Sequence, residues 1–337
     1  MEPDLHHHGD VEATPGLLDL AVNVRGTAPP AWLRGRLERA LDRLGSYPDQ
    51  HAARTAVARR HDREPADVLL TAGAAEAFVL LARALTPRRP LVVHPGFTEP
   101  EAALAAAGHE VDRLLLAPPY VLDPAQVPDD ADLVVIGNPT NPTGVVHERL
   151  AELCRPGRTV VVDEAFADAV PGEPHSLAGR ADLPGLIVVR SLTKTWALPG
   201  LRVGYLLAAP ALVDTLQRAQ PLWPVSTLGL TALETCLARG PVSSAAKEAA
   251  VLAQERVRLQ QALDQLGVEV APGSQAPFLL CRVPGRRDVR EALRDRGIAV
   301  RRGDTFPGLT AEHWRTAVRG PEESDQLLNA LADLLQQ

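Results

Sequence analysis

Two kinds of hydrophobic pattern alternate along the chain. Apolar residues recur every three or four positions, as in amphipathic helices, in residues 32–45, 51–62, 74–85 and 98–108. Short apolar runs rich in Val, Ile and Leu predict buried strands within residues 67–73, 90–96, 132–137, 159–166, 185–191 and 200–208. A short helix is expected at 149–154. Buried strands separated by helices indicate an α/β fold, a mostly parallel central sheet with helices on both faces.

The pattern changes after residue 225. A long amphipathic helix over 241–266 is followed by short strands at 278–283, 298–302 and 314–319 and by a closing helix at 323–336. This predicts a smaller α+β domain, joined by an N-terminal segment with a short strand at 18–22. We predict three parts: 1–44, an N-terminal arm and part of the small domain; 45–225, the large domain; 226–337, the C-terminal small domain.

Charge and cysteine content narrow the class of protein. The net charge of −7 over 337 residues argues against a nucleic-acid partner. Arginines between 286 and 302 alternate with acids, and we interpret them as a solvated helix face. Without an apolar stretch of about 18 residues or a signal peptide, no membrane partner is expected. Cys154, Cys236 and Cys281 fit neither a disulfide framework nor a zinc spacing, so we expect a reducing, cytoplasmic location and no metal site.

Lysine usage points to covalent chemistry. The 35 basic residues are 33 Arg and only two Lys, Lys194 and Lys247. Arginine replaces lysine on a surface but cannot form a Schiff base, because its guanidinium stays protonated. Lys194 lies in SLTKTWALPGLRVGY, residues 191–205, directly after an apolar run. Its patterned surroundings favour an amine that forms an imine over a solvated charge.

Polar residues that follow other strands complete a candidate site. Ser191, Thr193 and Arg202 are the residue types of a phosphate clamp. The free N–H groups of the Gly73–Ala75 turn (Gly73, Ala74, Ala75) would suit the same phosphate, although any strand–turn–helix has such groups. Asn141, in NPTNPTG, can direct its amide at a ligand oxygen, or the motif is a purely structural double turn. Asp163 follows three buried β-branched residues and needs a cationic partner or several hydrogen bonds.

These groups together fit pyridoxal 5′-phosphate. Lys194 would bind its aldehyde, Asp163 would keep its pyridine nitrogen protonated, and Asn141 would bond its phenolic oxygen. The motifs PGF, NPTNPTG, DEAF, SLTKxxxLPGLRxGY and WRxAVR, in this order, resemble the fold-type I, class I/II aminotransferase family over nearly the whole chain. Within it, the sequence looks most like the branch that holds L-threonine-O-3-phosphate decarboxylase of cobalamin biosynthesis, with histidinol-phosphate aminotransferase next.

The resemblance implies further roles. Phe97 would stack on the cofactor ring, and Tyr47 would reach the cofactor phosphate of a neighbouring subunit, which implies a homodimer with shared active sites. The substrate's carboxylate and phosphate would be bound by His8, Asn23, Arg315 and Arg319. The sequence departs from the family where Phe166 replaces a tyrosine, as in the decarboxylase branch, and where AGAA replaces the polar turn after Gly73. Arg25 could join the substrate site or be exposed.

The reaction depends on which bond of the substrate is broken. We expect decarboxylation of L-threonine O-3-phosphate to (R)-1-aminopropan-2-yl phosphate, and the alternative is an aminotransferase acting on a phosphorylated substrate such as histidinol phosphate. A non-catalytic cofactor-binding regulatory module is the third interpretation. Such modules are usually fused to a basic DNA-binding domain, for which this chain has no segment.

Overall fold

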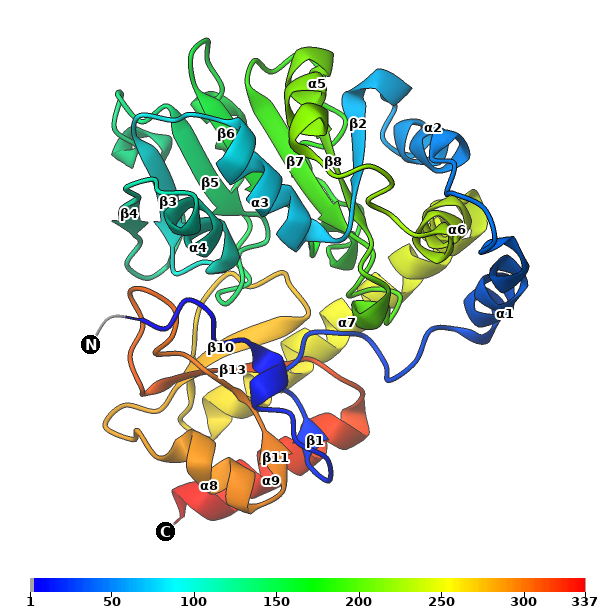
Figure 1. Ribbon diagram of the computed structural model, residues 1–337. Coiled ribbons are helices and arrows are strands. Elements are labelled where there is room, and N and C mark those ends of the chain that lie inside the picture. Colours follow the sequence, from blue (N-terminus) through cyan, green and yellow to red (C-terminus); the bar gives the residue numbers. More distant parts are fainter. Residues whose placement is uncertain (1–2, 337) are drawn as a thin grey trace.

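The computed structural model describes residues 3–336, and its largest element is a sheet whose strands are ordered β2-β8-β7-β6-β5-β3-β4 (Figure 1). β8 is antiparallel to both of its neighbours, and the remaining pairs are parallel. The strands are β2 Val68–Thr71, β3 Pro90–His94, β4 Asp112–Leu115, β5 Leu133–Gly137, β6 Thr159–Asp163, β7 Leu186–Ser191 and β8 Gly204–Ala208. This confirms the predicted mostly parallel sheet.

Both faces of the large sheet are covered because its strand residues are apolar on both sides. Val161 packs in a cluster with α3 Ala74–Ala84, α4 Glu99–Ala106 and α5 Pro210–Ala219. Its neighbours Val160 and Val162 belong to the opposite cluster. That cluster includes residues of α1 Ala31–Ala40, α2 His51–Arg60 and α6 Thr227–Cys236. The alternation of side chains along a strand therefore separates the two faces one residue at a time.

A smaller sheet of order β12-β13-β10-β9 lies below the large one in Figure 1. It packs with helices around Leu263, Leu279 and Trp314. β1 Leu18–Asp19 pairs in parallel with β11 Ile298–Ala299, so the N-terminal segment joins this part of the molecule. The other elements here are β9 Glu269–Val270, β10 Phe278–Arg282, β12 Arg301–Arg302, β13 His313–Ala317, α7 Arg239–Gln265, α8 Val289–Asp295 and α9 Pro321–Leu335.

Several local predictions differ from the structure. β4, α5 and α6 were not predicted, and the short helix at 149–154 is a 3-10 turn over Leu150–Leu153. The strand predicted over 200–208 begins only at Gly204, because Pro199–Leu201 forms a 3-10 turn and Arg202 has φ +52°. The domain limits remain a prediction, and residues 1–2 and 337 lie outside the described chain. α1 packs against α6, and both contribute to the core of the large sheet.

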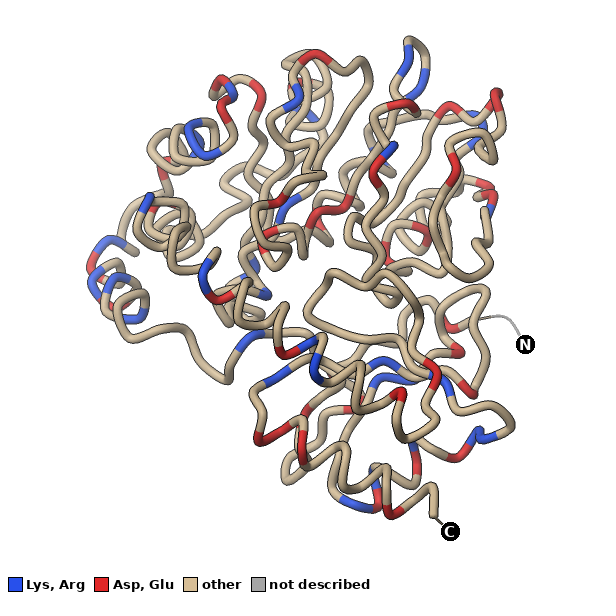
Figure 2. Tube along the Cα trace, turned by 180° about the vertical axis from the view of Figure 1, so that it is seen from behind, with Lys and Arg blue, Asp and Glu red and all other residues tan. Residues whose placement is uncertain are grey.

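Figure 2 shows basic and acidic residues interspersed along the trace. Many of them form short-range surface pairs, such as Arg180 with Asp182 and Arg286 with Asp288. Among residues 3–336, no helix combines the length and the apolar character needed to cross a bilayer.

Candidate active site

A pocket of about 400 Å³ opens at the carboxyl ends of β5, β6 and β7, where ligands of parallel sheets usually bind. It brings together most of the residues singled out from the sequence. Those that line it are His8, Asn23, Ala74, Ala75, Phe97, Asn141, Asp163, Ser191, Thr193, Lys194, Arg202 and Arg315. They come from both sheets and from the N-terminal arm, so the fold gathers groups that are far apart in the sequence.

Three predicted residues do not line this pocket. Gly73 lies directly behind it with φ +85°, and a Cβ there would come 2.8 Å from a terminal nitrogen of Arg202. Arg319 is partly buried beside the pocket and donates to the carbonyl of Val22 at 2.6 Å. Tyr47 is 76% exposed and stacks on Trp223 with ring centroids 4.2 Å apart. Within this chain Tyr47 is therefore remote from the site.

Lys194 follows β7 in a loop that turns back into β8. Burial, and then the charges of Arg315 and Arg202, lower the pKa of Lys194 to about 8, against the opposing effect of Asp163. A larger fraction of this amine is therefore unprotonated near neutral pH than for an ordinary lysine, which makes it a better nucleophile and a better proton carrier.

Asp163 ends β6 and faces the pocket. Its Oδ1 accepts a hydrogen bond from the N–H of Ala165 at 3.0 Å. Burial raises the pKa of Asp163 to about 6, although the Ala165 N–H and the charge of Lys194 favour the ionised form. The carboxylate is thus short of positive partners, and a protonated ring nitrogen placed against it would relieve this cost.

Arg315 and Asn141 join the two sheets across the pocket. Arg315 projects from β13, and its Nη1 donates to Oδ1 of Asn141 at 2.5 Å. Its Nη2 donates to the carbonyl of Ala21, and its buried Nε has no partner in the described part of the chain. Asn23 is only 6% exposed, and among residues 3–336 neither polar atom of its amide has a partner. Such orphaned groups are costly unless a ligand satisfies them.

Arg301 is a pocket residue that the sequence interpretation missed. It falls in the strand predicted at 298–302, but we counted it among the solvated arginines; it lies on β12, is 2% exposed and lines the pocket. Its Nη2 donates to the carbonyl of His7 at 2.6 Å and to Oγ1 of Thr305 at 2.7 Å. The signal was available, because Arg301 follows the buried run Ile-Ala-Val just as Asp163 follows Val-Val-Val.

The N-terminal arm forms one wall of the pocket. His8 Nε2 lies 2.6 Å from Oε1 of Glu99, and the ring of His8 lies 5.6 Å from that of Phe97. Oγ1 of Thr98 donates to the carbonyl of Leu5 at 2.6 Å. Arg25 is not part of this wall. Its guanidinium is largely buried and lies 3.9 Å from Glu248, outside the pocket lining.

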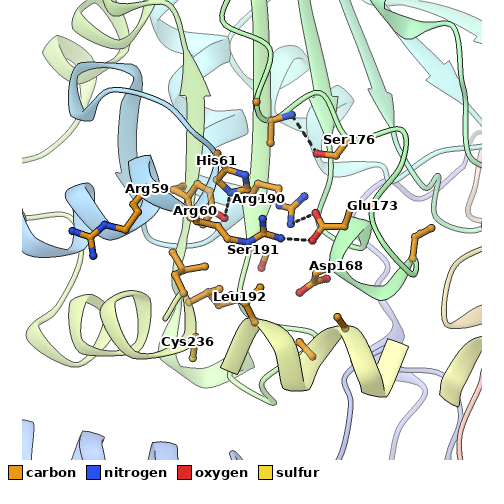
Figure 3. Close-up of a pocket in the computed structure, with 18 of the residues that line it drawn as sticks. Arg59, Arg60, His61, Asp168, Glu173, Ser176, Arg190, Ser191, Leu192 and Cys236 are labelled. Atoms are coloured by element: carbon orange, nitrogen blue, oxygen red, sulfur yellow. Dashed lines mark hydrogen bonds and ion pairs between the residues drawn. The ribbon is translucent and has the colours of Figure 1, made fainter. Parts of the chain in front are cut away.

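A second cavity of about 490 Å³ lies behind Ser191 (Figure 3). Arg190 faces it because successive residues of β7 point to opposite sides. Its terminal nitrogens lie 2.9 Å from Glu164 and 2.8 Å from Glu173, and Glu173 also pairs with Arg60 at 2.5 Å. Unlike the groups of the first pocket, these charges are matched by direct ion pairs.

The comparisons with known proteins agree with this geometry. The model of the family described as aminotransferase class I and II matches residues 15–331. A histidinol-phosphate aminotransferase of Mycobacterium tuberculosis is 52% identical over 93% of this chain and 86% of its own length. A threonine-phosphate decarboxylase of Salmonella typhimurium is 33% identical over 95% and 91%.

The fold agrees as well. The solved histidinol-phosphate aminotransferase of Clostridium acetobutylicum superposes with a TM-score of 0.87 at 25% identity, covering 95% of this chain and 99% of the other. The pocket fits pyridoxal 5′-phosphate, the cofactor of these enzymes. It offers the amine of Lys194, the carboxylate of Asp163, the unsatisfied amide of Asn23 and the Gly73 turn against Arg202. The chain belongs to the class I and II aminotransferase family and is a pyridoxal-phosphate-dependent enzyme of fold type I.

Proposed function

We propose that this enzyme is an aminotransferase that acts on a phosphorylated amine such as histidinol phosphate. The observation that carries the proposal is the placement of Lys194 in one pocket with two buried arginines, Arg301 and Arg315. The 52% identity to a protein named histidinol-phosphate aminotransferase favours this reaction over the decarboxylation expected from the sequence motifs.

Each functional group of the cofactor would meet a matching group in the pocket. Lys194 would bind the aldehyde, and Asp163 would pair with the pyridine nitrogen. Asn141 would donate to the phenolic oxygen with the amide nitrogen that Arg315 leaves free, and Phe97 would stack on the ring. The phosphate would be held by Ser191, Thr193, Arg202 and the backbone of Gly73, Ala74 and Ala75. The bound cofactor supplies an electron sink for the carbon that reacts.

The acid–base work falls to Lys194. With cofactor and substrate bound, the amine of Lys194 would take the proton from the substrate Cα and would return it to the carbon that carried the cofactor's aldehyde. The pKa of about 8 suits both directions of transfer. The wall formed by the arm and Phe97 limits the access of water to this proton.

The anionic groups of the substrates require cations that are already desolvated. Arg315 would bind a carboxylate, with Arg319 beside it. Arg301, Asn23 and His8 would bind the phosphate at the other side of the pocket. Arg301 and Arg315 are held by carbonyl oxygens and hydroxyls rather than by acids, so their charge is available to a ligand.

Decarboxylation of threonine O-3-phosphate is a second candidate. Phe166 is the observation in its favour, because it lines the pocket where the aminotransferase pattern has a tyrosine. The 33% identity to a threonine-phosphate decarboxylase agrees with it. Both candidates require the same cofactor and the same cations.

A product assay separates the two reactions. The loaded enzyme is incubated with histidinol phosphate or threonine O-3-phosphate, each with and without 2-oxoglutarate. The proposal expects glutamate to form from histidinol phosphate and only when 2-oxoglutarate is present. Release of CO₂ from threonine O-3-phosphate without 2-oxoglutarate would overturn it in favour of the second candidate.

A homodimer with shared sites completes the proposal. Tyr47 stacks on the exposed Trp223, and other exposed apolar side chains lie on the chain segments before and beside these two residues: Trp32, Leu41, Leu44 and Leu222. A second copy would cover this surface, and its Tyr47 would reach the cofactor phosphate. Mixing Lys194→Ala and Tyr47→Ala subunits should restore part of the activity, because one mixed site has both residues. The three free cysteines agree with the cytoplasmic location we propose.

A further inference from the structure

The loop that carries Lys194 is restrained from both sides. On one side the N–H of Arg25 donates to the carbonyl of Lys194 at 2.8 Å. On the other side Thr195, which is 5% exposed, donates its hydroxyl to Oδ2 of Asp168 at 2.5 Å. This second bond joins the residue directly after Lys194 to a carboxylate outside the loop.

Asp168 belongs to the same short segment as Asp163. β6 ends at Asp163, and a 3-10 turn over Ala167–Ala169 brings Asp168 behind the lysine loop. Asp163 lines the first pocket and Asp168 lines the second cavity, where Figure 3 shows it near Ser191 and Glu173. One segment of six residues therefore faces Lys194 from the front and holds its neighbour from behind.

The hydrogen bond between Thr195 and Asp168 is stronger than one between two neutral groups, because its acceptor is a carboxylate and both side chains are shielded from solvent. Burial raises the pKa of Asp168, while the nearby charges of Arg190 and Arg25 and the Thr195 hydroxyl favour its ionised form. Nothing in the proposed chemistry uses either residue, because neither Asp168 nor Thr195 lines the cofactor pocket.

We propose that Asp168 is a positioning residue that, through the hydroxyl of Thr195, fixes Lys194 in the orientation needed to attach the cofactor. The inference rests on the proposed role of Lys194. A restrained amine gains in reactivity because its geometry is set before the reaction. Noncovalent binding of the cofactor's ring and phosphate does not need this restraint.

Two ligands separate positioning from general stability. Pyridoxal 5′-phosphate reacts with Lys194, whereas pyridoxamine 5′-phosphate lacks the aldehyde and reports the noncovalent pocket alone. Both are titrated into the full-length protein, and borohydride reduction followed by peptide mass spectrometry measures the fraction fixed to Lys194. We expect Asp168→Ala and Thr195→Val each to weaken pyridoxal phosphate binding by about tenfold and to leave pyridoxamine phosphate binding unchanged.

Three further variants complete the test. Thr195→Ser keeps the hydroxyl and should match the parent protein. The double variant Asp168→Ala/Thr195→Val should lose no more than either single variant, because both remove one bond. Thr235→Val removes a hydroxyl that, within residues 3–336, bonds only the helix carbonyl of Thr231, and it should change the binding of neither ligand. Equal weakening of both ligands, or no weakening of pyridoxal phosphate, would overturn the proposal. No substrate is added, so the result does not depend on which amine the enzyme uses.

Discussion

The first pocket and the second cavity, which both include Ser191, contain buried charged residues whose charges are balanced in different ways. At the second cavity, Arg190, Glu173 and Arg60 and the adjoining Glu164 neutralise one another through ion pairs of 2.5–2.9 Å. In the first pocket, the amine of Lys194 and the carboxylate of Asp163 are left without an ion pair within the described chain. Charged groups that link structural elements, such as Arg190 and Glu164, are therefore paired with one another. Lys194 and Asp163, which we expect to contact a ligand, are left unpaired.

The largest effect on function should come from the unpaired amine. Lys194→Ala should lower turnover by roughly 10⁴-fold, because the chain loses both the covalent attachment point and the proton carrier. The measurement is product formation together with the visible absorbance of bound cofactor. Lys247→Ala, at the only other lysine, removes an exposed charge on α7 and should behave as the parent does. Equal loss in both variants would contradict the assignment.

The paired cavity should respond in stability instead. Arg190→Met leaves Glu164 buried without its cation and should lower the free energy of unfolding by about 3–5 kcal/mol. Urea unfolding measures it. Arg89→Met breaks pairs at the surface and should have little effect. If Arg190→Met unfolded at the parent's urea concentration, the cavity charges would not be structural.

Asp163→Asn should move stability and function in opposite directions. The folded-state pKa of about 6 lies above the ordinary 3.8. Protonated Asp163 therefore stabilises the fold at low pH, and this contribution is lost as pH rises through 6. At pH 8 the cofactor-free variant should be more stable than the parent by up to about 3 kcal/mol, a gain that shrinks toward pH 4. Thermal unfolding at both pH values measures it.

The same substitution should reduce turnover by roughly 10²-fold, because an amide cannot pair with the charge of the ring nitrogen. A variant with lowered stability at pH 8 would show that Asp163 is already well satisfied without the cofactor. Asp163 would then not be an unpaired charge, and the difference between the first pocket and the second cavity would not hold.

The smallest effect is expected at Arg301. Arg301→Met should raise KM for a phosphorylated amine about tenfold, the contribution of one charge-assisted hydrogen bond, with kcat changed less. The corresponding amine without phosphate should show no such increase. Equal increases for both amines would mean that Arg301 supports the fold around His7 and Thr305 rather than the phosphate.

The sequence predicted the parts of the molecule that depend on short-range patterns. Asp163, Asn141 and Lys194 follow buried strands, so their shared position at one sheet edge follows from the parallel topology. β4 escaped prediction because Asp112–Leu115 begins with two charged residues and its side chains are exposed or half-buried, unlike the continuous buried runs of the other strands.

Contacts between distant segments could not be read from pattern. His7 and Arg301 meet although 294 positions separate them. Asp168 lies in the segment after β6 and Thr195 in the loop after β7, and nothing in either motif specifies their hydrogen bond. Arg301 was counted among the solvated arginines because charges alternate along 286–302. Its segment was predicted as a strand, but only the pairing with β13 shows that Arg301 is buried.

The N-terminal arm has a mechanical consequence. It is anchored to the large sheet's side through Thr98 and Glu99, and to the small sheet's side through Arg290 and Arg301. The arm therefore links the large sheet's side to the small sheet's side, and its hydrogen bonds resist any movement that separates the two sides at the pocket. Widening the pocket at this edge requires these contacts to break, so residues 5–12 limit how far the entrance opens.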